Sequence, residues 1–201
     1  MTDPALLYLA SASPRRHDIL SQMGIPHHVL SVPPPPGEDE PIHDGESAAD
    51  YVQRTARDKA RHALHWIGSQ FLPPLPILSA DTTVILDGNI LGKPRNRDDA
   101  AATLKRLSGR EHEVRTAIAI VHSGRLYEDV SVTRVRFRDL AEHDIQTYCA
   151  TGEPMGKAGS YAIQGWAGRF VAHLDGSYTG VMGLPMYETD QLLIKAGVLT
   201  S

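Results

Sequence analysis

Residues 77–86 read ILSADTTVIL, and this stretch decides the fold that we expect. Its length and apolar content predict a long strand. Asp87-Gly88 follows directly, and this dipeptide is typical of a type I′ hairpin turn that returns the chain over residues 90–94. Asp81 lies inside the apolar run. A carboxylate in a central strand is unfavourable unless it is paired, hydrogen-bonded or bound to a metal, so Asp81 needs a partner.

Further strands and helices are predicted on both sides of this segment in the sequence. Strands are expected at residues 6–10, 114–122, 126–138 and 169–174, and helices at residues 14–23, from 47 onward, 98–108, 141–150 and 186–196. Residues 31–46 contain four consecutive prolines and are expected to form an extended loop. This order of elements predicts an α/β fold with a mixed, twisted sheet and flanking helices.

The starts of two helices carry specific signals. Ser13 is expected to cap the first helix, with Pro14 in its first position. Ser47 is expected to cap the second, with Asp50 as the partner in a capping box. In this second helix, apolar residues recur every four positions and predict one buried row. The row consists of Val52, Ala56, Ala60 and Leu64.

Composition and charge narrow the class of protein. A chain of 201 residues with 41% hydrophobic and 22% charged residues is expected to fold as a single domain over residues 1–201. The net charge of -4 argues against wholesale binding of nucleic acid or of an anionic membrane. A single cysteine, Cys149, excludes an internal disulfide, and we expect it to be buried. Neither a secretory signal nor a membrane span is recognisable, so a cytoplasmic location is expected.

The segment Ser11-Ala12-Ser13-Pro14-Arg15-Arg16 joins a predicted strand to a helix N-terminus. The free N–H groups and the dipole of such a terminus favour an anion, and arginine is well shaped to hold phosphate oxygens. The segment therefore indicates a triphosphate-binding site. The alternative is an ordinary capped helix with two solvated arginines.

Asp81 and Lys59 are candidates for the chemistry itself. Asp81 is interpreted as a base or a metal ligand, with a hydrogen-bonded structural role as the alternative. Lys59 shares a helical row with Tyr51, Thr55 and Ala63 beside the buried row, so it borders the core. Its alternative role is that of a lysine whose stem covers apolar surface while its ammonium reaches water.

Three further residues have weaker signals. Lys93 lies between Gly92 and Pro94, which could aim its side chain, although an exposed turn lysine is the alternative. Glu40 could complete an oxygen site for magnesium with Asp81, or belong to a solvated acidic loop. Gln164 could read the edge of a nucleobase through its amide, or be an ordinary polar residue.

The basic cluster Arg54, Arg57, Arg61, His62 and His65 is interpreted as a solvated helix face. It is the main sequence argument for a nucleic-acid binder, which the net charge of -4 disfavours. The histidines show no metalloprotease spacing and are interpreted as surface or core polar residues.

Four motifs occur in order: Ser-Ala-Ser-Pro-Arg-Arg at 11–16, Ala-Asp-Thr at 80–82, Gly-Lys-Pro at 92–94 and Lys-Ala-Gly-Ser-Tyr-Ala-Ile-Gln-Gly at 157–165. Together they resemble the Maf family of nucleoside triphosphate pyrophosphatases over nearly the whole chain. The resemblance implies two lobes around a nucleotide cleft, similar to inosine-triphosphatase-like proteins. It also implies cleavage between the α and β phosphates with a divalent metal, Mg or Mn, and a possible homodimer.

The resemblance also implies a role for each motif residue. Asp81 would be the general base that activates water. The phosphates would be held by Ser11, Arg15, Arg16, Lys59 and Lys93. Glu40 would help to bind metal together with Asp81, and Asp39 is the alternative for that acidic position. Base choice would involve Arg15, Thr82 and Gln164.

The late motif is similar to that of the branch of the family that acts on dTTP and UTP. Two positions depart from the usual pattern: Gly156 stands where an acid is usual, and Ala162 where a glycine is common. Alternatives are a pyrophosphatase for a purine or modified nucleotide, and a nucleotide-binding regulator of cell division without useful catalysis. The presence of Asp81 speaks against the regulator, since pure binding needs no base.

Overall fold

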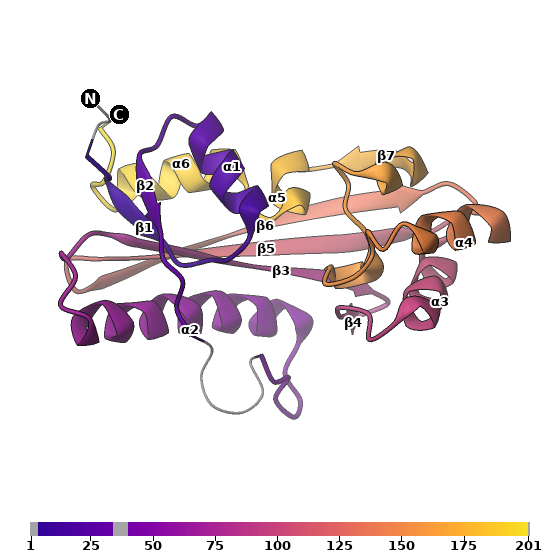
Figure 1. The fold of residues 1–201 in the computed structure, drawn as a ribbon, viewed down its shortest axis with the longest axis horizontal. Helices are drawn as coiled ribbons and strands as arrows, with labels where there is room; N and C mark the ends of the chain where they lie inside the picture. Colours follow the sequence, from indigo (N-terminus) through magenta and orange to yellow (C-terminus); the bar gives the residue numbers. More distant parts are fainter. Residues whose placement is uncertain (1–3, 34–39, 201) are drawn as a thin grey trace. The chain divides into compact units, whose positions relative to one another are not determined.

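The computed structural model describes residues 4–33 and 40–200, which form two compact units (Figure 1). Within the described residues, the first unit comprises 4–33, 40–81, 116–130 and 183–200, and the second comprises 82–115 and 131–182. The strands are β1 (Leu7–Leu9), β2 (His27–Val29), β3 (Ile77–Leu86), β4 (Asn89–Leu91), β5 (Glu111–His122), β6 (Arg125–Phe137) and β7 (Val171–Asp175). The α-helices are α1 (Pro14–Gln22), α2 (Ala48–Ser69), α3 (Arg97–Leu107), α4 (Glu142–Ala150), α5 (Tyr178–Met182) and α6 (Met186–Lys195). Two 3-10 helices are η1 (Ala158–Ser160) and η2 (Trp166–Phe170).

The described strands form one mixed sheet in the order β2-β1-β3-β5-β6-β7, with β4 paired to β3. β1 pairs in parallel with β2 and with β3. The β3–β4 and β6–β7 pairs are antiparallel. The predicted α/β fold with a mixed sheet and flanking helices is therefore confirmed. β2 and α5 were not predicted, because segments of three and five residues are too short to carry a periodic pattern.

In the first unit, α2 packs on one side of the strands, and α1 and α6 lie on the other (Figure 1). The core against α2 includes Tyr8, Ile77 and alternate residues of β5. From the predicted row, Val52, Ala56 and Ala60 are buried, but Leu64 is 47% exposed. Ala63 and Ile67 are buried farther along the helix. An α-helix turns every 3.6 residues, so a strict four-residue row rotates out of the core.

The predicted cap of α2 is present. The Ser47 hydroxyl oxygen accepts a hydrogen bond from the Asp50 backbone N–H at 3.1 Å. The same hydroxyl donates to the Asp50 carboxylate at 2.6 Å. These bonds satisfy a helix-end donor and fix where α2 begins, directly after the segment that carries Glu40.

The second unit has its own apolar core, built from β3, β5, β6, α3, α4 and the 158–170 region. The hairpin after β3 has positive φ at Asp87 (52°) and Gly88 (76°), as the predicted type I′ turn requires. Gly159 also has a positive φ of 66°, and a Cβ there would lie 2.8 Å from a Val84 methyl carbon. The Gly-rich segment is therefore pressed against β3 rather than lying loose.

His112 is buried within this second core. Its Nε2 is 2.8 Å from the Tyr161 hydroxyl, and its ring meets Phe137 and Tyr161 edge to face. Burial lowers the pKa of His112 to about 4. The imidazole is thus neutral at pH 7, which agrees with the expected core polar role. Cys149 is buried, as predicted.

Overpacking the α2 row tests the corrected pattern. Ala60→Leu inserts extra carbons at a position with 0% exposure and is expected to lower the free energy of unfolding by about 1–3 kcal/mol. Leu64→Ala, on the same helix, should change it by less than about 0.5 kcal/mol because Leu64 is half exposed. Urea unfolding measures both variants. A larger loss for Leu64→Ala than for Ala60→Leu would contradict the packing described.

His112 should make stability depend on pH. Its folded pKa of about 4 lies below the unfolded value of 6.5, so its contribution is complete above pH 6.5 and is lost as pH falls toward 4. The free energy of unfolding should fall by a total on the order of 3 kcal/mol for this reason. Urea unfolding between pH 7.5 and 4.5 should give a smaller drop in stability for His112→Gln than for the unmodified chain. Equal drops would contradict the burial of a neutral imidazole.

Candidate active site

The turn between β1 and α1 is organised by Ser11. The predicted side-chain cap from Ser13 is wrong: Ser13 occupies the N-cap position, but its hydroxyl makes no capping hydrogen bond. Instead, the Ser11 hydroxyl oxygen accepts from the Ser13 backbone N–H at 3.2 Å and from Arg16 Nη1 at 3.1 Å. Ser11 therefore holds both the turn and the guanidinium that follows it.

Arg16 is anchored at a second point. Its Nε donates to the Gly183 carbonyl oxygen at 2.8 Å. Desolvation lowers the pKa of Arg16, while the charges of Asp81 and Glu40 act in the opposite direction. Arg15 and Arg16 are both half-buried. The alternative of a solvated side chain is thus excluded for Arg16, whose fixed positive charge lies within electrostatic range of both carboxylates.

Asp81 and Lys59 meet because a strand and a helix present residues at matching intervals. Side chains two apart in a strand share a face, so Ser79 and Asp81 both point toward α2. The Ser79 hydroxyl donates to the Ala56 carbonyl oxygen at 2.6 Å. Lys59 lies one helical turn beyond Ala56, and its Nζ lies 2.8 Å from Asp81 Oδ1.

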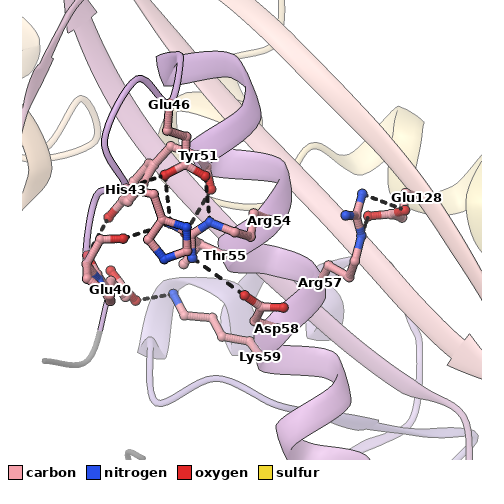
Figure 2. A network of polar contacts seen from close by, with 11 residues as sticks. Glu40, His43, Glu46, Tyr51, Arg54, Thr55, Arg57, Asp58, Lys59 and Glu128 are labelled. Atoms are coloured by element: carbon pink, nitrogen blue, oxygen red, sulfur yellow. Dashed lines mark hydrogen bonds and ion pairs between the residues drawn. The ribbon is translucent and has the colours of Figure 1, made fainter. Parts of the chain in front are cut away.

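Lys59 also forms an ion pair with Glu40 (Figure 2). The carboxylates of Glu40 and Asp81 therefore share one ammonium. The Asp81 side chain is 8% exposed, that of Glu40 19% and that of Lys59 30%. The alternative role of Lys59, an ammonium directed to water, is therefore excluded. Asp81 has the partner that its burial requires. Asp39, the alternative to Glu40, lies outside the described residues.

Tyr51 adds a neutral donor beside this charge cluster. Its hydroxyl donates to the Glu40 carbonyl oxygen at 3.4 Å. Burial, reinforced by the charges of Asp81 and Glu40, raises the pKa of Tyr51 to about 12. The phenol stays protonated at neutral pH and holds the backbone of Glu40. The sequence pattern places Tyr51 in the helical row of Lys59 but does not indicate a role for it.

The other predicted site residues belong to the second unit and are described within it. Thr82 follows Asp81 in β3 and is half-buried, whereas Lys93 and Gln164 are exposed. The Gly159 backbone N–H donates to the Gly92 carbonyl oxygen at 3.2 Å. The Gly-Lys-Pro motif and the late Gly-rich motif, far apart in sequence, therefore lie side by side.

Glu153 anchors the late motif, although no feature of the sequence singled it out. Its carboxylate accepts from the Tyr148 hydroxyl at 3.0 Å and from the Trp166 backbone N–H at 3.1 Å. A Cβ on Gly165 would collide with the Glu153 carboxylate. The Lys157 ammonium donates to the Glu153 carbonyl oxygen. Gly156 carries no acid, and the Glu153 carboxylate contacts this segment instead.

The donor set around Lys59 suits a hard divalent cation. Magnesium is usually held by one or two carboxylates together with phosphate oxygens and water. Glu40 and Asp81 already converge on one cationic atom. Residues 4–33 and 40–200 contain no group of three His, Cys, Asp or Glu side chains arranged for a metal.

The basic cluster on α2 is not a free cationic face. Arg54 is paired with Glu46, and Arg57 with Glu128 at 2.9 Å. The interpretation of a solvated face is wrong for these two arginines, although Arg61 is exposed. Separately, no helix in the described part of the chain is both long and apolar enough to cross a membrane.

Comparison of the sequence with known proteins identifies the family of this chain. Residues 6–196 match the family model described as Maf-like protein. A protein of Bordetella pertussis named dTTP/UTP pyrophosphatase is 65% identical, over 98% of this chain and 95% of its own. Proteins with the same name from Nitrosomonas europaea and Chromobacterium violaceum are 47% and 46% identical, over 96% and 98% of this chain and 95% and 97% of their own. The chain belongs to the Maf family.

Proposed function

We propose that this protein is a nucleoside triphosphate pyrophosphatase that hydrolyses dTTP and UTP to the monophosphate and pyrophosphate. The observation that carries the proposal is the convergence of Glu40 and Asp81 on the Lys59 ammonium. Three relatives that align over nearly their full length bear the name dTTP/UTP pyrophosphatase. The late motif, Lys-Ala-Gly-Ser-Tyr-Ala-Ile-Gln-Gly, agrees with that substrate class.

In the proposed reaction, Asp81 accepts a proton from the attacking water. The oxygen of that water forms a bond to phosphorus as the bond between the α and β phosphates breaks, and pyrophosphate leaves. Phosphoryl transfer depends mainly on positioning and on neutralising charge. Lys59 and Arg16 supply fixed positive charge around Asp81. These side chains therefore need to move little as negative charge develops on the phosphates in the transition state.

A divalent cation, Mg or Mn, is proposed as the cofactor. Glu40 and Asp81 would hold it, with phosphate oxygens of the nucleotide completing its ligands. When bound, the metal would neutralise charge on the phosphates. The Lys59 ammonium links these two carboxylates in the nucleotide-free chain and keeps them close together.

The remaining site residues are proposed as substrate contacts. Ser11, Arg15, Arg16 and Lys93 would hold the phosphates, while Thr82 and Gln164 would act with Arg15 in choosing the base. The anchoring of Arg16 to Ser11 and Gly183 supports a pre-set guanidinium rather than a mobile one. The exposure of Gln164 leaves its amide accessible to a ligand.

Several broader expectations are carried forward as proposals. A cytoplasmic location, a single domain over residues 1–201 and a homodimer rest on the sequence and on the family resemblance. The absence of a nucleic-acid partner is supported by the pairing of Arg54 and Arg57 with carboxylates and by the net charge of -4.

Removing the proposed base tests the reaction. Asp81→Asn is expected to lower turnover of dTTP and UTP by at least about 100-fold, because general base catalysis contributes about 10²–10⁴-fold. Pyrophosphate release is measured with Mg or Mn, and after removal of metal with a chelator, on dTTP, UTP, CTP, dATP, GTP and 7-methyl-GTP. Asp18→Asn, on the exposed face of α1, is the matched control.

The panel also separates the competing functions. Retained hydrolysis in Asp81→Asn would overturn the mechanism, and turnover confined to purine or methylated nucleotides would overturn the substrate class. No turnover of any nucleotide by the unmodified chain would favour the binding regulator.

Gln164 tests the choice of base separately from the chemistry. Gln164→Ala is expected to narrow the ratio of kcat/KM between UTP and CTP by about tenfold, the scale of one to two lost hydrogen bonds. The maximal rate on UTP should change much less. Gln146→Ala, an amide on the surface of α4, is the control. An unchanged ratio would remove Gln164 from base recognition.

A further inference from the structure

Arg54 binds the segment of residues 40–46 at two places (Figure 2). Its Nε and Nη2 donate to the two carboxylate oxygens of Glu46, at 2.5 and 2.8 Å. The same Nη2 donates to the Pro41 carbonyl oxygen at 2.7 Å. Pro41 is the residue directly after Glu40. One guanidinium on α2 therefore fastens both ends of this segment.

The Glu46 carboxylate depends on Arg54. Its side chain is 8% exposed, and pairing with Arg54 lowers the pKa of Glu46 to about 2. Its Oε2 also accepts from the His43 backbone N–H at 3.2 Å, while the Glu46 backbone N–H donates to the His43 carbonyl oxygen at 3.0 Å. Glu46 thus closes a turn within the segment, and Arg54 ties that turn to the helix.

Glu40 lies in no helix or strand. Ordering a loop residue costs backbone entropy, so the position of Glu40 must come from contacts with other parts of the chain. The Tyr51 hydroxyl donates to the Glu40 carbonyl oxygen, and the Arg54 guanidinium donates to the carbonyl oxygen of Pro41, the next residue. Tyr51, Arg54 and Lys59 all project from α2, so the helix that carries the ammonium also carries the contacts that hold the carboxylate.

We propose that Arg54 is a positioning residue, which clasps residues 40–46 onto α2 and so sets the Glu40 carboxylate against the Lys59 ammonium. The clasp requires the fork of a guanidinium, because one side chain must reach a carboxylate and a separate carbonyl together. Lysine offers a single charged atom and can satisfy only part of this set. The catalytic consequence of the clasp rests on the proposed pyrophosphatase activity.

Arg57 provides a matched control. It lies one turn farther along α2 and is paired bidentately with Glu128, at 2.9 and 3.2 Å. Its side chain is 33% exposed, compared with 21% for Arg54. Arg57→Met therefore removes a similar ion pair from the same helix while leaving residues 40–46 untouched. Any general loss of stability should appear in both variants.

The experiment is a double-mutant cycle in kcat/KM for dTTP with Arg54→Met and Glu40→Gln. We expect Arg54→Met to lower kcat/KM by about 10–100-fold when Glu40 is present, since small misplacements at a site have effects of this size. In the Glu40→Gln background it should lower kcat/KM by less than about threefold. Arg54→Lys should recover part of the loss, and Arg57→Met should stay within about twofold of the unmodified chain.

A second measurement does not depend on activity. Hydrogen–deuterium exchange of the nucleotide-free protein should show faster exchange over residues 41–47 in Arg54→Met than in Arg57→Met. Equal exchange in the two variants would overturn the clasp. If Arg54→Met lowers kcat/KM equally with Glu40 and with Gln at position 40, Arg54 does not act through Glu40. If the unmodified chain hydrolyses no nucleotide, the pyrophosphatase proposal fails, and the exchange result alone decides whether the clasp exists.

Discussion

A buried carboxylate within the β3 strand is the constraint around which the first unit is built. Asp81 is 8% exposed on its side chain, and an unpaired charge at such a depth would be strongly unfavourable. Lys59 can reach it because small residues on α2 allow the helix to lie close to β3. The Ser79 bond to the Ala56 carbonyl fixes the helix one turn before Lys59.

The same pairing has a functional side. The Lys59 ammonium that neutralises Asp81 also pairs with Glu40. A carboxylate on a strand and a carboxylate on a loop therefore meet at the same cation. Neither acid occupies that point through its own secondary structure alone. The loop acid depends on a second cation, Arg54, and on the neutral phenol of Tyr51. Charge is therefore arranged before any substrate arrives, which is the condition under which electrostatic stabilisation is effective.

Rules that use only neighbouring residues predicted the elements whose structure depends on neighbouring residues. The β3 strand, the Asp87-Gly88 turn and the Ser47 cap follow from apolar pattern, turn chemistry and capping, and each is present. The predictions failed where a small error in helical period adds up over several turns, or where contacts with distant residues determine the local structure. Leu64 is half exposed because a four-residue row drifts around a helix. Ser13 occupies the N-cap position, but its hydroxyl makes no capping bond, and the Ser11 hydroxyl organises the turn instead.

The candidate site divides in the same way. Asp81 stood out because a charge in an apolar strand is anomalous by itself, and Lys59 because it borders the core row. Arg54 and Glu153 carried no such anomaly. An arginine among other helical arginines looks solvated until the path of residues 40–46 is known, and Glu153 acquires its role only when Trp166 and Gly165 fold back over it.

The most direct test of the central pairing is the free energy of unfolding of nucleotide-free Lys59→Met, Asp81→Asn and the double variant. Lys59→Met alone leaves two acids without their shared cation and should be the least stable of the three. Adding Asp81→Asn removes one of those charges, so the double variant should be more stable than Lys59→Met. If Asp81→Asn instead destabilises the chain equally with Lys and with Met at position 59, the buried carboxylate does not depend on Lys59.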